Sequence, residues 1–139
     1  MSLQLKTQFA DGLLDVEVRG QFSLEEAKRT FLETLDSVGQ HRAGKVLIDG
    51  SGLKGEPEVL ERFFYGQFAA MESARAAREQ DMPRPWFAYV LEEPVLDPRR
   101  LGENVASNRG MIVKAFNNRE EALKWLQAGS ADKSGEGNP

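Results

Sequence analysis

The sequence predicts one α/β domain built on a mixed β-sheet, and three observations support this prediction. Apolar and polar residues alternate on both sides of Asp11-Gly12, which is typical of a β-hairpin. Two short apolar stretches, 45–48 and 86–91, suit strands that are covered on both faces. Apolar residues at helical spacing occupy the segments between the later strands, so we expect those strands to be mostly parallel.

The composition argues against several classes of protein. The chain has 139 residues and a net charge of −4, whereas a general nucleic-acid-binding domain usually has a basic face. No apolar run approaches the roughly 20 residues of a membrane-spanning helix, and the first residues do not resemble a signal peptide. Cysteine is absent, which excludes disulfides and thiolate metal sites. We therefore expect a cytoplasmic protein without an integral membrane segment, a metal or a cofactor.

A hairpin and a helix form the first part of the predicted fold. Alternating residues place the two strands at about 3–9 and 14–18. Ser23, followed three residues later by Glu26, has the pattern of a capping box and predicts the start of the helix. Gly39 is a natural end for it.

After the central strand 45–48, helices and strands alternate. Pro57 fits the first turn of a long helix that runs to about Gln80. Asp97, followed by a proline, predicts the start of a shorter helix before the last strand, 111–116. The predicted order is β-β-α-β-α-β-α-β-α.

The chain should end in a helix and a tail. Asn118 is a suitable N-cap for a helix that carries apolar residues as far as Leu126. The residues that follow it have no apolar face. We predict a single domain at 1–127 and a disordered tail at 128–139.

Three stretches, 46–53, 108–116 and 120–126, together with the order of the elements, resemble the SpoIIAA-like superfamily. This superfamily includes the anti-anti-sigma (STAS) domains, and the chain is most similar to its small bacterial proteins described as STAS-like or CRAL-TRIO-like. The resemblance covers about residues 3–127. It implies a mixed β-sheet with helices packed mainly on one face, and it implies binding rather than catalysis.

The resemblance also implies a phosphorylated serine at the start of the helix after the central strand. That position lies near 55–59, and no serine or threonine occurs between Ser51 and Ser73. We therefore expect no phosphorylation site there. Glu56 and Glu58 instead supply a permanent negative charge, which also suits a helix start.

Two successive strands of the chain end in acidic residues, which would share one rim if the strands are neighbours. Asp49 ends the central strand, and Glu92 and Glu93 end the next one. Carboxylates that converge on one rim can perform acid–base chemistry. The simpler interpretation, which we favour, is that Asp49 accepts hydrogen bonds from the amides of the following turn.

The segment after the central strand has two further features. Gly50, Gly52 and Gly55 fit a dinucleotide-binding fingerprint, but the acid expected about 20 residues later would fall in mid-helix. Ligands of open α/β sheets bind beyond the carboxyl ends of the strands. Arg99 and Arg100, near the start of the shorter helix, suit an anion or acidic partner there, whereas the simpler interpretation, which we favour, is that they are solvated. The predicted partner- or ligand-binding rim is Asp49, Ser51, Lys54, Glu56, Glu58, Arg99 and Arg100.

The long helix has more aromatic residues than one buried face can hold. Phe63, Phe64 and Tyr65 are consecutive, so they span roughly 200° of its circumference. The excess surface could line a pocket, form a dimer interface or pack against a neighbouring helix. The predicted aromatic face or pocket comprises Phe63, Phe64, Tyr65, Phe68 and Trp86.

These features support two main hypotheses and a weaker third. The first is a non-catalytic binding or regulatory domain that contacts a protein partner or a second copy of itself, as a homodimer. The alternative is a carrier of a small apolar ligand, with Phe64, Phe68 and Trp86 near the pocket. An enzyme that uses Asp49 and a glutamate ranks last, because no nucleophile–base pair is readable.

Overall fold

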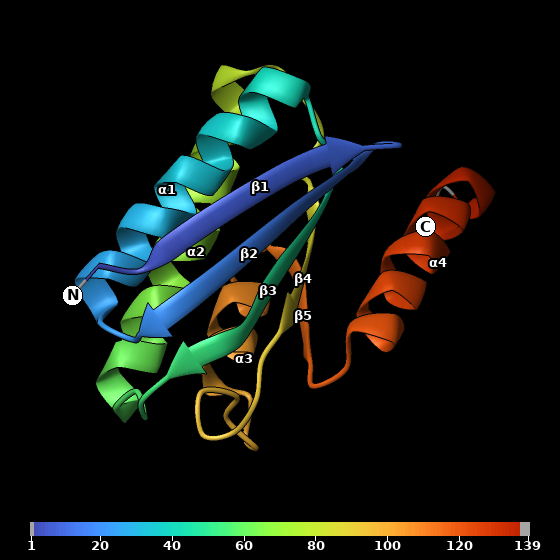
Figure 1. Ribbon diagram of the computed structural model, residues 1–139. Helices are drawn as coiled ribbons and strands as arrows, with labels where there is room; N and C mark the ends of the chain where they lie inside the picture. Colours follow the sequence, from blue (N-terminus) through green and yellow to red (C-terminus); the bar gives the residue numbers. More distant parts are fainter. Residues whose placement is uncertain (1, 137–139) are drawn as a thin grey trace.

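The structure is a computed structural model that describes residues 2–136. Five strands form one sheet in the order β1-β2-β3-β4-β5, where β1 and β2 are antiparallel and all other neighbours are parallel (Figure 1). The element order confirms the prediction: β1 (Gln4–Ala10), β2 (Leu13–Gln21), α1 (Leu24–His41), β3 (Lys45–Lys54), α2 (Val59–Glu79), β4 (Trp86–Val90), α3 (Leu101–Asn108), β5 (Ile112–Phe116) and α4 (Arg119–Glu136).

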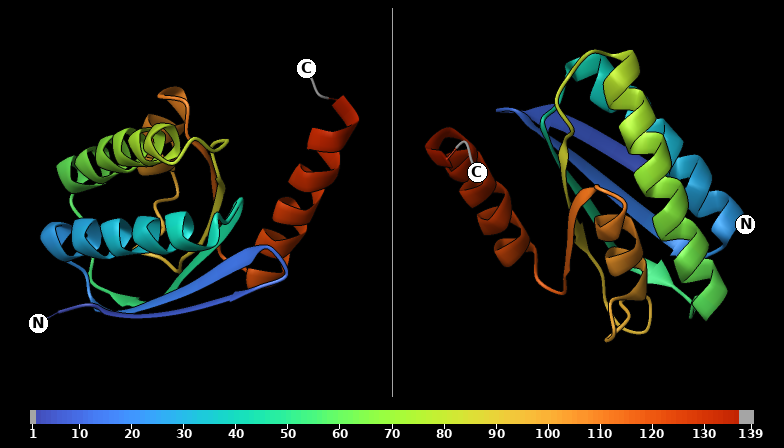
Figure 2. Two further views of the ribbon diagram at one scale, coloured as in Figure 1. Left: turned by 90° about the horizontal axis from the view of Figure 1, so that it is seen from above. Right: turned by 180° about the vertical axis from the view of Figure 1, so that it is seen from behind.

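The sheet is covered by three helices on one face and by one on the other. Figure 2 shows α1, α2 and α3 on the first face and α4 on the second, as expected for helices mainly on one side. Val46 and Ile48 of β3 belong to the core under the three helices, while Leu47 belongs to the smaller core under α4. β3 is therefore the central strand and is buried on both faces, as its apolar residues predict.

The β1–β2 hairpin turns at the predicted Asp-Gly pair. Asp11 and Gly12 both have positive φ, 53° and 79°, which is the geometry of a type I′ turn. The hairpin pairs Thr7 with Val16, and Val16 is fully buried under the helices. The opposite face of β1 and β2 carries mainly polar residues, since α4 contacts β3, β4 and β5 instead.

The central strand is longer than predicted. β3 continues to Lys54, so Gly50 and Gly52 lie within the strand rather than in a turn after it. A Cβ atom on Gly50 would lie 2.8 Å from Leu53, and one on Gly52 would lie 2.9 Å from the Cβ of Arg19 on β2. These glycines therefore permit close packing in the sheet, and they do not open a helix as a dinucleotide fingerprint would require.

Several helix boundaries also differ from the prediction. α1 passes Gly39 and ends at His41, because Arg42 adopts the left-handed conformation that terminates the helix. α2 begins at Val59 rather than at Pro57, and Glu58 is its N-cap in a capping box with Glu61. α3 begins at Leu101, after a turn whose amides bond to Asp97.

Helix α4 begins where predicted but continues beyond the expected end. Asn118 accepts a hydrogen bond from the amide of Glu121, as an N-cap does. The helix runs to Glu136, so it includes most of the predicted tail. Gly129 is buried against the ring of Trp86, and this contact lies beyond the last residue with an obvious apolar role. The prediction for 137–139 lies outside the described residues.

Candidate functional site

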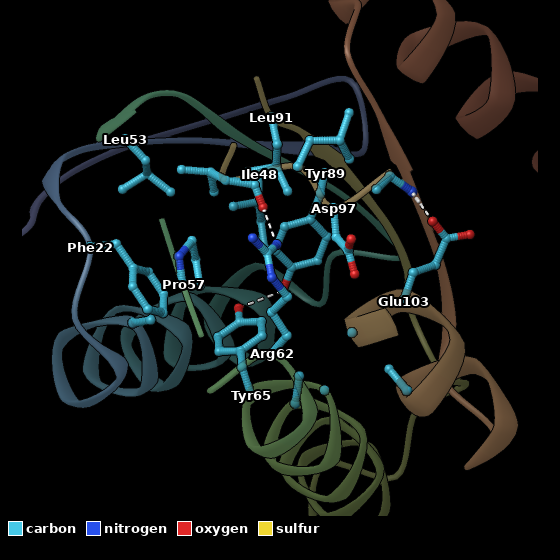
Figure 3. Close-up of a pocket in the computed structure, with 18 of the residues that line it drawn as sticks. Phe22, Ile48, Leu53, Pro57, Arg62, Tyr65, Tyr89, Leu91, Asp97 and Glu103 are labelled. Carbon is cyan, nitrogen blue, oxygen red and sulfur yellow. Dashed lines mark hydrogen bonds between the residues drawn. The ribbon is translucent and has the colours of Figure 1, made fainter. Parts of the chain in front are cut away.

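An apolar cavity of about 150 Å³ lies between the sheet and the helices (Figure 3). Its floor comes from the carboxyl-terminal parts of β3, β4 and β5, and its walls come from α2, α3 and the segment between β4 and α3. The cavity is therefore near the carboxyl ends of the central strands, where ligands of open α/β sheets commonly bind, but Arg100 is the one predicted rim residue that lines it. Its lining includes Phe22, Ile48, Leu53, Pro57, Arg62, Tyr65, Tyr89, Leu91, Val95, Leu96, Ala106 and Val113.

Two tyrosines meet in this cavity. The hydroxyl oxygens of Tyr65 on α2 and Tyr89 on β4 are 2.7 Å apart and share a hydrogen bond (Figure 3). The two rings are nearly perpendicular, with their centroids 6.2 Å apart. Burial raises the pKa of both hydroxyls above the ordinary value of 10.0, and both therefore stay protonated at a pH where a free tyrosine ionises.

The segment between β4 and α3 is fastened over the cavity by α2. The guanidinium group of Arg62 donates hydrogen bonds to the carbonyl oxygens of Pro94, at 2.7 Å, and of Val95, at 2.8 Å. On the other side, Arg100 donates to the carbonyl oxygen of Ala115 at 2.6 Å and also bonds to Glu103. The charged groups at the cavity wall are thus bonded to the protein itself.

Comparisons with known proteins support the family of folds that the sequence suggests. No family model and no curated protein matches the chain. An anti-sigma factor antagonist from Mycobacterium paratuberculosis has a similar structure, with a TM-score of 0.57 and 16% identity over 91% of this chain and 95% of that chain. The chain has the SpoIIAA-like fold. An uncharacterized protein with a SpoIIAA-like fold from Shewanella loihica aligns with a TM-score of 0.44 and 13% identity, over 90% and 94% of the two chains.

In this SpoIIAA-like fold, Asp49 lies within β3, which continues to Lys54, so no turn follows it directly. Its carboxylate nevertheless accepts hydrogen bonds from the amide and hydroxyl of Ser51, at 3.1 and 2.8 Å, so the predicted bond to a following amide is present but lies within the strand. Its other carboxylate oxygen is 3.0 Å from Arg119, which also pairs with Asp15. The pair with Asp15 raises the pKa of Arg119. These contacts fasten α4 to the sheet, on the face opposite the cavity.

The remaining rim residues are in different surroundings. Arg100 is a wall residue of the cavity, but its bond to Ala115 makes it a structural link between α3 and β5. Arg99 and Lys54 are exposed. Glu56 and Glu58 are also exposed and lie at the start of α2, beside the cavity residue Pro57.

The predicted aromatic residues separate into three groups. Tyr65 lines the cavity, and Phe68 packs against the main core. Phe63 lies under the guanidinium group of Arg109, while Phe64 is exposed. Trp86 contacts Trp125 of α4, with ring centroids 5.0 Å apart, and so lies on the other face of the sheet. The prediction that Phe64, Phe68 and Trp86 are near a pocket is therefore wrong for this cavity, because none of the three lines it.

Sequence reasoning did not identify Tyr89 or Arg62 as site residues. The sequence does contain an indication for Tyr89. Phe87, Tyr89 and Leu91 are alternate residues of the predicted strand and point to one face of the sheet, whereas Trp86 points to the other face. Arg62 had no such signal, because its partners are backbone carbonyls more than 30 residues away.

Neither a membrane-spanning helix nor a metal-binding cluster is found in the part of the chain that the structure describes. None of its helices is both long enough and apolar enough to cross a bilayer. It contains no cluster of three or more histidine, cysteine or acidic side chains arranged to hold a metal ion.

The tyrosine pair predicts a dependence of stability on alkaline pH. Unfolded tyrosines ionise near pH 10, whereas the folded pair stays protonated, so the contribution of this pair to the free energy of unfolding should be constant below about pH 10 and fall above it. The chain contains only two tyrosines, so tyrosinate absorbance reports this pair alone. Absorbance that rises near pH 10 while near-ultraviolet circular dichroism remains native would contradict the prediction.

Proposed function

We propose that the chain is a protein-interaction domain whose docking surface is the outer face of α2, and that this surface binds a second copy of the chain. The observation that carries the proposal is a stripe of exposed apolar side chains along the helix. Leu60 is 64% exposed, Phe64 is 44% exposed and Met71 is 58% exposed. At 100° per residue, the three side chains lie within about 40° of one another around α2.

Such a stripe is unusual for a surface that remains in water. Single exposed apolar residues are common on soluble proteins, but several large ones on one side of a helix indicate an interface. A neighbouring helix covers other aromatic residues of α2, since Phe68 packs under Lys28 of α1 and against the main core. No described element of the fold covers Leu60, Phe64 and Met71 to the same extent.

The charges at the two ends of the stripe support self-association. Glu56 and Glu58 lie at the amino-terminal end, and the exposed Arg75 and Arg78 lie on the same face near the carboxyl-terminal end. Arg75 also pairs with Glu72 within the helix. Two copies of α2 that pack antiparallel would therefore place the acidic end of each helix beside the basic end of the other, as in a two-fold symmetric dimer.

The antiparallel arrangement also aligns the apolar residues. When Leu60 of one copy lies opposite Met71 of the other, Phe64 lies close to the two-fold axis, and the acidic residues that precede α2 lie toward the end of the partner helix that carries Arg75 and Arg78. A stable dimer usually buries about 1,200–2,000 Å² of surface. We therefore expect neighbouring residues of α1, such as the exposed Leu32, to contribute to the contact.

Sedimentation velocity with one charged substitution tests the proposal. The wild-type protein should sediment as a dimer of 15.5 kDa chains, and Phe64→Glu should yield monomers, because an unpaired charge in the centre of an interface costs about 2 kcal/mol or more. Gln8→Glu, which adds the same charge on the polar face of β1, should leave the dimer intact. A wild-type protein that is monomeric at high micromolar concentration contradicts the proposal.

The apolar cavity supports a second candidate function, a carrier of a small apolar ligand. Ligand sites are concave, mostly apolar and equipped with a few polar groups, and the cavity with its tyrosine pair has these properties. Titration with small apolar molecules, followed by amide chemical shifts, tests this candidate independently of the dimer. Shifts confined to the residues around Tyr65 and Tyr89 are expected, and their absence would contradict it.

A further inference from the structure

We propose that the cavity binds a small, neutral, mostly apolar molecule that carries one hydrogen-bond acceptor, and that a hydroxyl group of the Tyr65–Tyr89 pair donates to that acceptor. This inference rests on the second candidate function, the carrier, and does not depend on self-association. The chemical class that fits is a small cyclic or aromatic ketone, aldehyde or ether.

The tyrosine pair has one hydroxyl hydrogen that is free to bond to a ligand. Each hydroxyl has one hydrogen, and the bond between Tyr65 and Tyr89 uses only one of the two. Among the described residues, neither hydroxyl has another protein hydrogen-bond partner. A donor left without an acceptor in an apolar site is unfavourable, so an acceptor on a ligand would be stabilised there.

The neutrality of the ligand follows from the surrounding charges. Arg62 is bonded to Pro94 and Val95, and Arg100 is bonded to Ala115 and Glu103. Glu103 also accepts the amide of Ala115, at 3.1 Å. The two other charged lining residues are bonded as well: Asp97 accepts the amides of Arg99 and Leu101, and Glu61 accepts the amide of Glu58. With these groups occupied by the protein, a charged ligand would lose its hydration without gaining a partner.

The size of the ligand follows from the cavity volume. The cavity is about 150 Å³, and an apolar cavity of about 150 Å³ accommodates benzene. A molecule with six to eight non-hydrogen atoms fits this space, whereas a long-chain lipid does not. Ile48 of β3 and Ala106 of α3 both line this space.

Two probes of the same shape isolate the role of the hydroxyl. Cyclohexanone has a carbonyl oxygen where methylenecyclohexane has a CH₂ group, so only cyclohexanone can accept a hydrogen bond. The wild-type protein should bind both probes in the cavity. Tyr65→Phe/Tyr89→Phe should weaken the binding of cyclohexanone about three- to tenfold, the worth of one hydrogen bond, and should change that of methylenecyclohexane less than twofold. Both affinities are measured by titration of amide chemical shifts.

A second measurement needs no variant. With ¹³C-labelled tyrosine, the spectrum contains signals from only two residues, and both belong to the pair. The Cζ signals of the wild-type protein should shift with cyclohexanone and shift less with methylenecyclohexane. This result is available even if the double variant does not fold.

The outcomes separate this inference from the function on which it rests. Binding of methylenecyclohexane alone, or unchanged binding of cyclohexanone by the double variant, overturns the hydroxyl donor and leaves the carrier function standing. Failure of both probes to bind overturns both. Dimerisation, measured by sedimentation, is unaffected by either result.

Discussion

Phe31→Ala should lower the free energy of unfolding by about 3–5 kcal/mol, the usual cost of removing a fully buried phenylalanine. Phe31 is 2% exposed and lies where α1, α2 and the sheet meet. Its ring is 5.7 Å from that of Phe87, 6.1 Å from that of Tyr65 and 6.5 Å from that of Phe68, between centroids. The substitution therefore removes apolar burial and three aromatic contacts together.

The adjacent residue provides a matched control for this prediction. Leu32 follows Phe31 in α1 but is 42% exposed, so in the monomer, where it makes no dimer contact, Leu32→Ala should change the free energy of unfolding by only about 0.5 kcal/mol. Urea denaturation of both variants, at a protein concentration low enough for both to be monomeric, measures the difference. Equal losses in the two variants would contradict the placement of the core between α1 and the sheet.

The second large effect concerns the contact between α2 and α3. A Cβ atom on Gly66 would lie 2.5 Å from the carbonyl oxygen of Gly102 and 3.2 Å from the Cβ of Val105. Gly66→Ala should therefore force the helices apart and lower the free energy of unfolding by about 1–3 kcal/mol, as overpacking does. At an exposed glycine within a helix, substitution by alanine instead raises the free energy of unfolding, by about 1 kcal/mol.

A substitution at Gly39 serves as a control that separates the effect of helix propensity from the effect of overpacking. It also lies within a helix, α1, but the atoms that a Cβ on Gly39 would meet belong to the side chain of Gln80, which can move away. Gly39→Ala should therefore be neutral or stabilising in the same thermal or chemical denaturation experiment. A Gly66→Ala protein that is as stable as Gly39→Ala would show that α2 and α3 do not approach as closely as the structure has them.

Local sequence patterns predicted the order and the direction of the elements. The Asp11-Gly12 turn, the Ser23 cap and the Asn118 cap each depend on a few adjacent residues, and the structure confirms all three. The apolar stretch 45–48 likewise predicted a strand covered on both faces, because consecutive apolar side chains point alternately to the two sides.

The features that were missed depend on contacts between distant residues. Gly50 and Gly52 suggested a turn, yet they continue β3 because side chains and the neighbouring strand approach them closely. Gly129 suggested a tail, yet it packs against Trp86. The cavity depends on Tyr65 and Tyr89 meeting across 24 residues of sequence, and spacing along the chain does not encode such a contact.

The central claim, an antiparallel contact between two copies of α2, is tested most directly by cysteine cross-linking. The chain has no cysteine, so Leu60→Cys and Met71→Cys each introduce a single thiol. A mixture of the two variants under mild oxidation should form the mixed disulfide, identified by its mass, faster than either variant forms a disulfide alone. Equal or faster formation of the symmetric disulfide by Leu60→Cys alone, or no disulfide in the mixture, would contradict the antiparallel dimer.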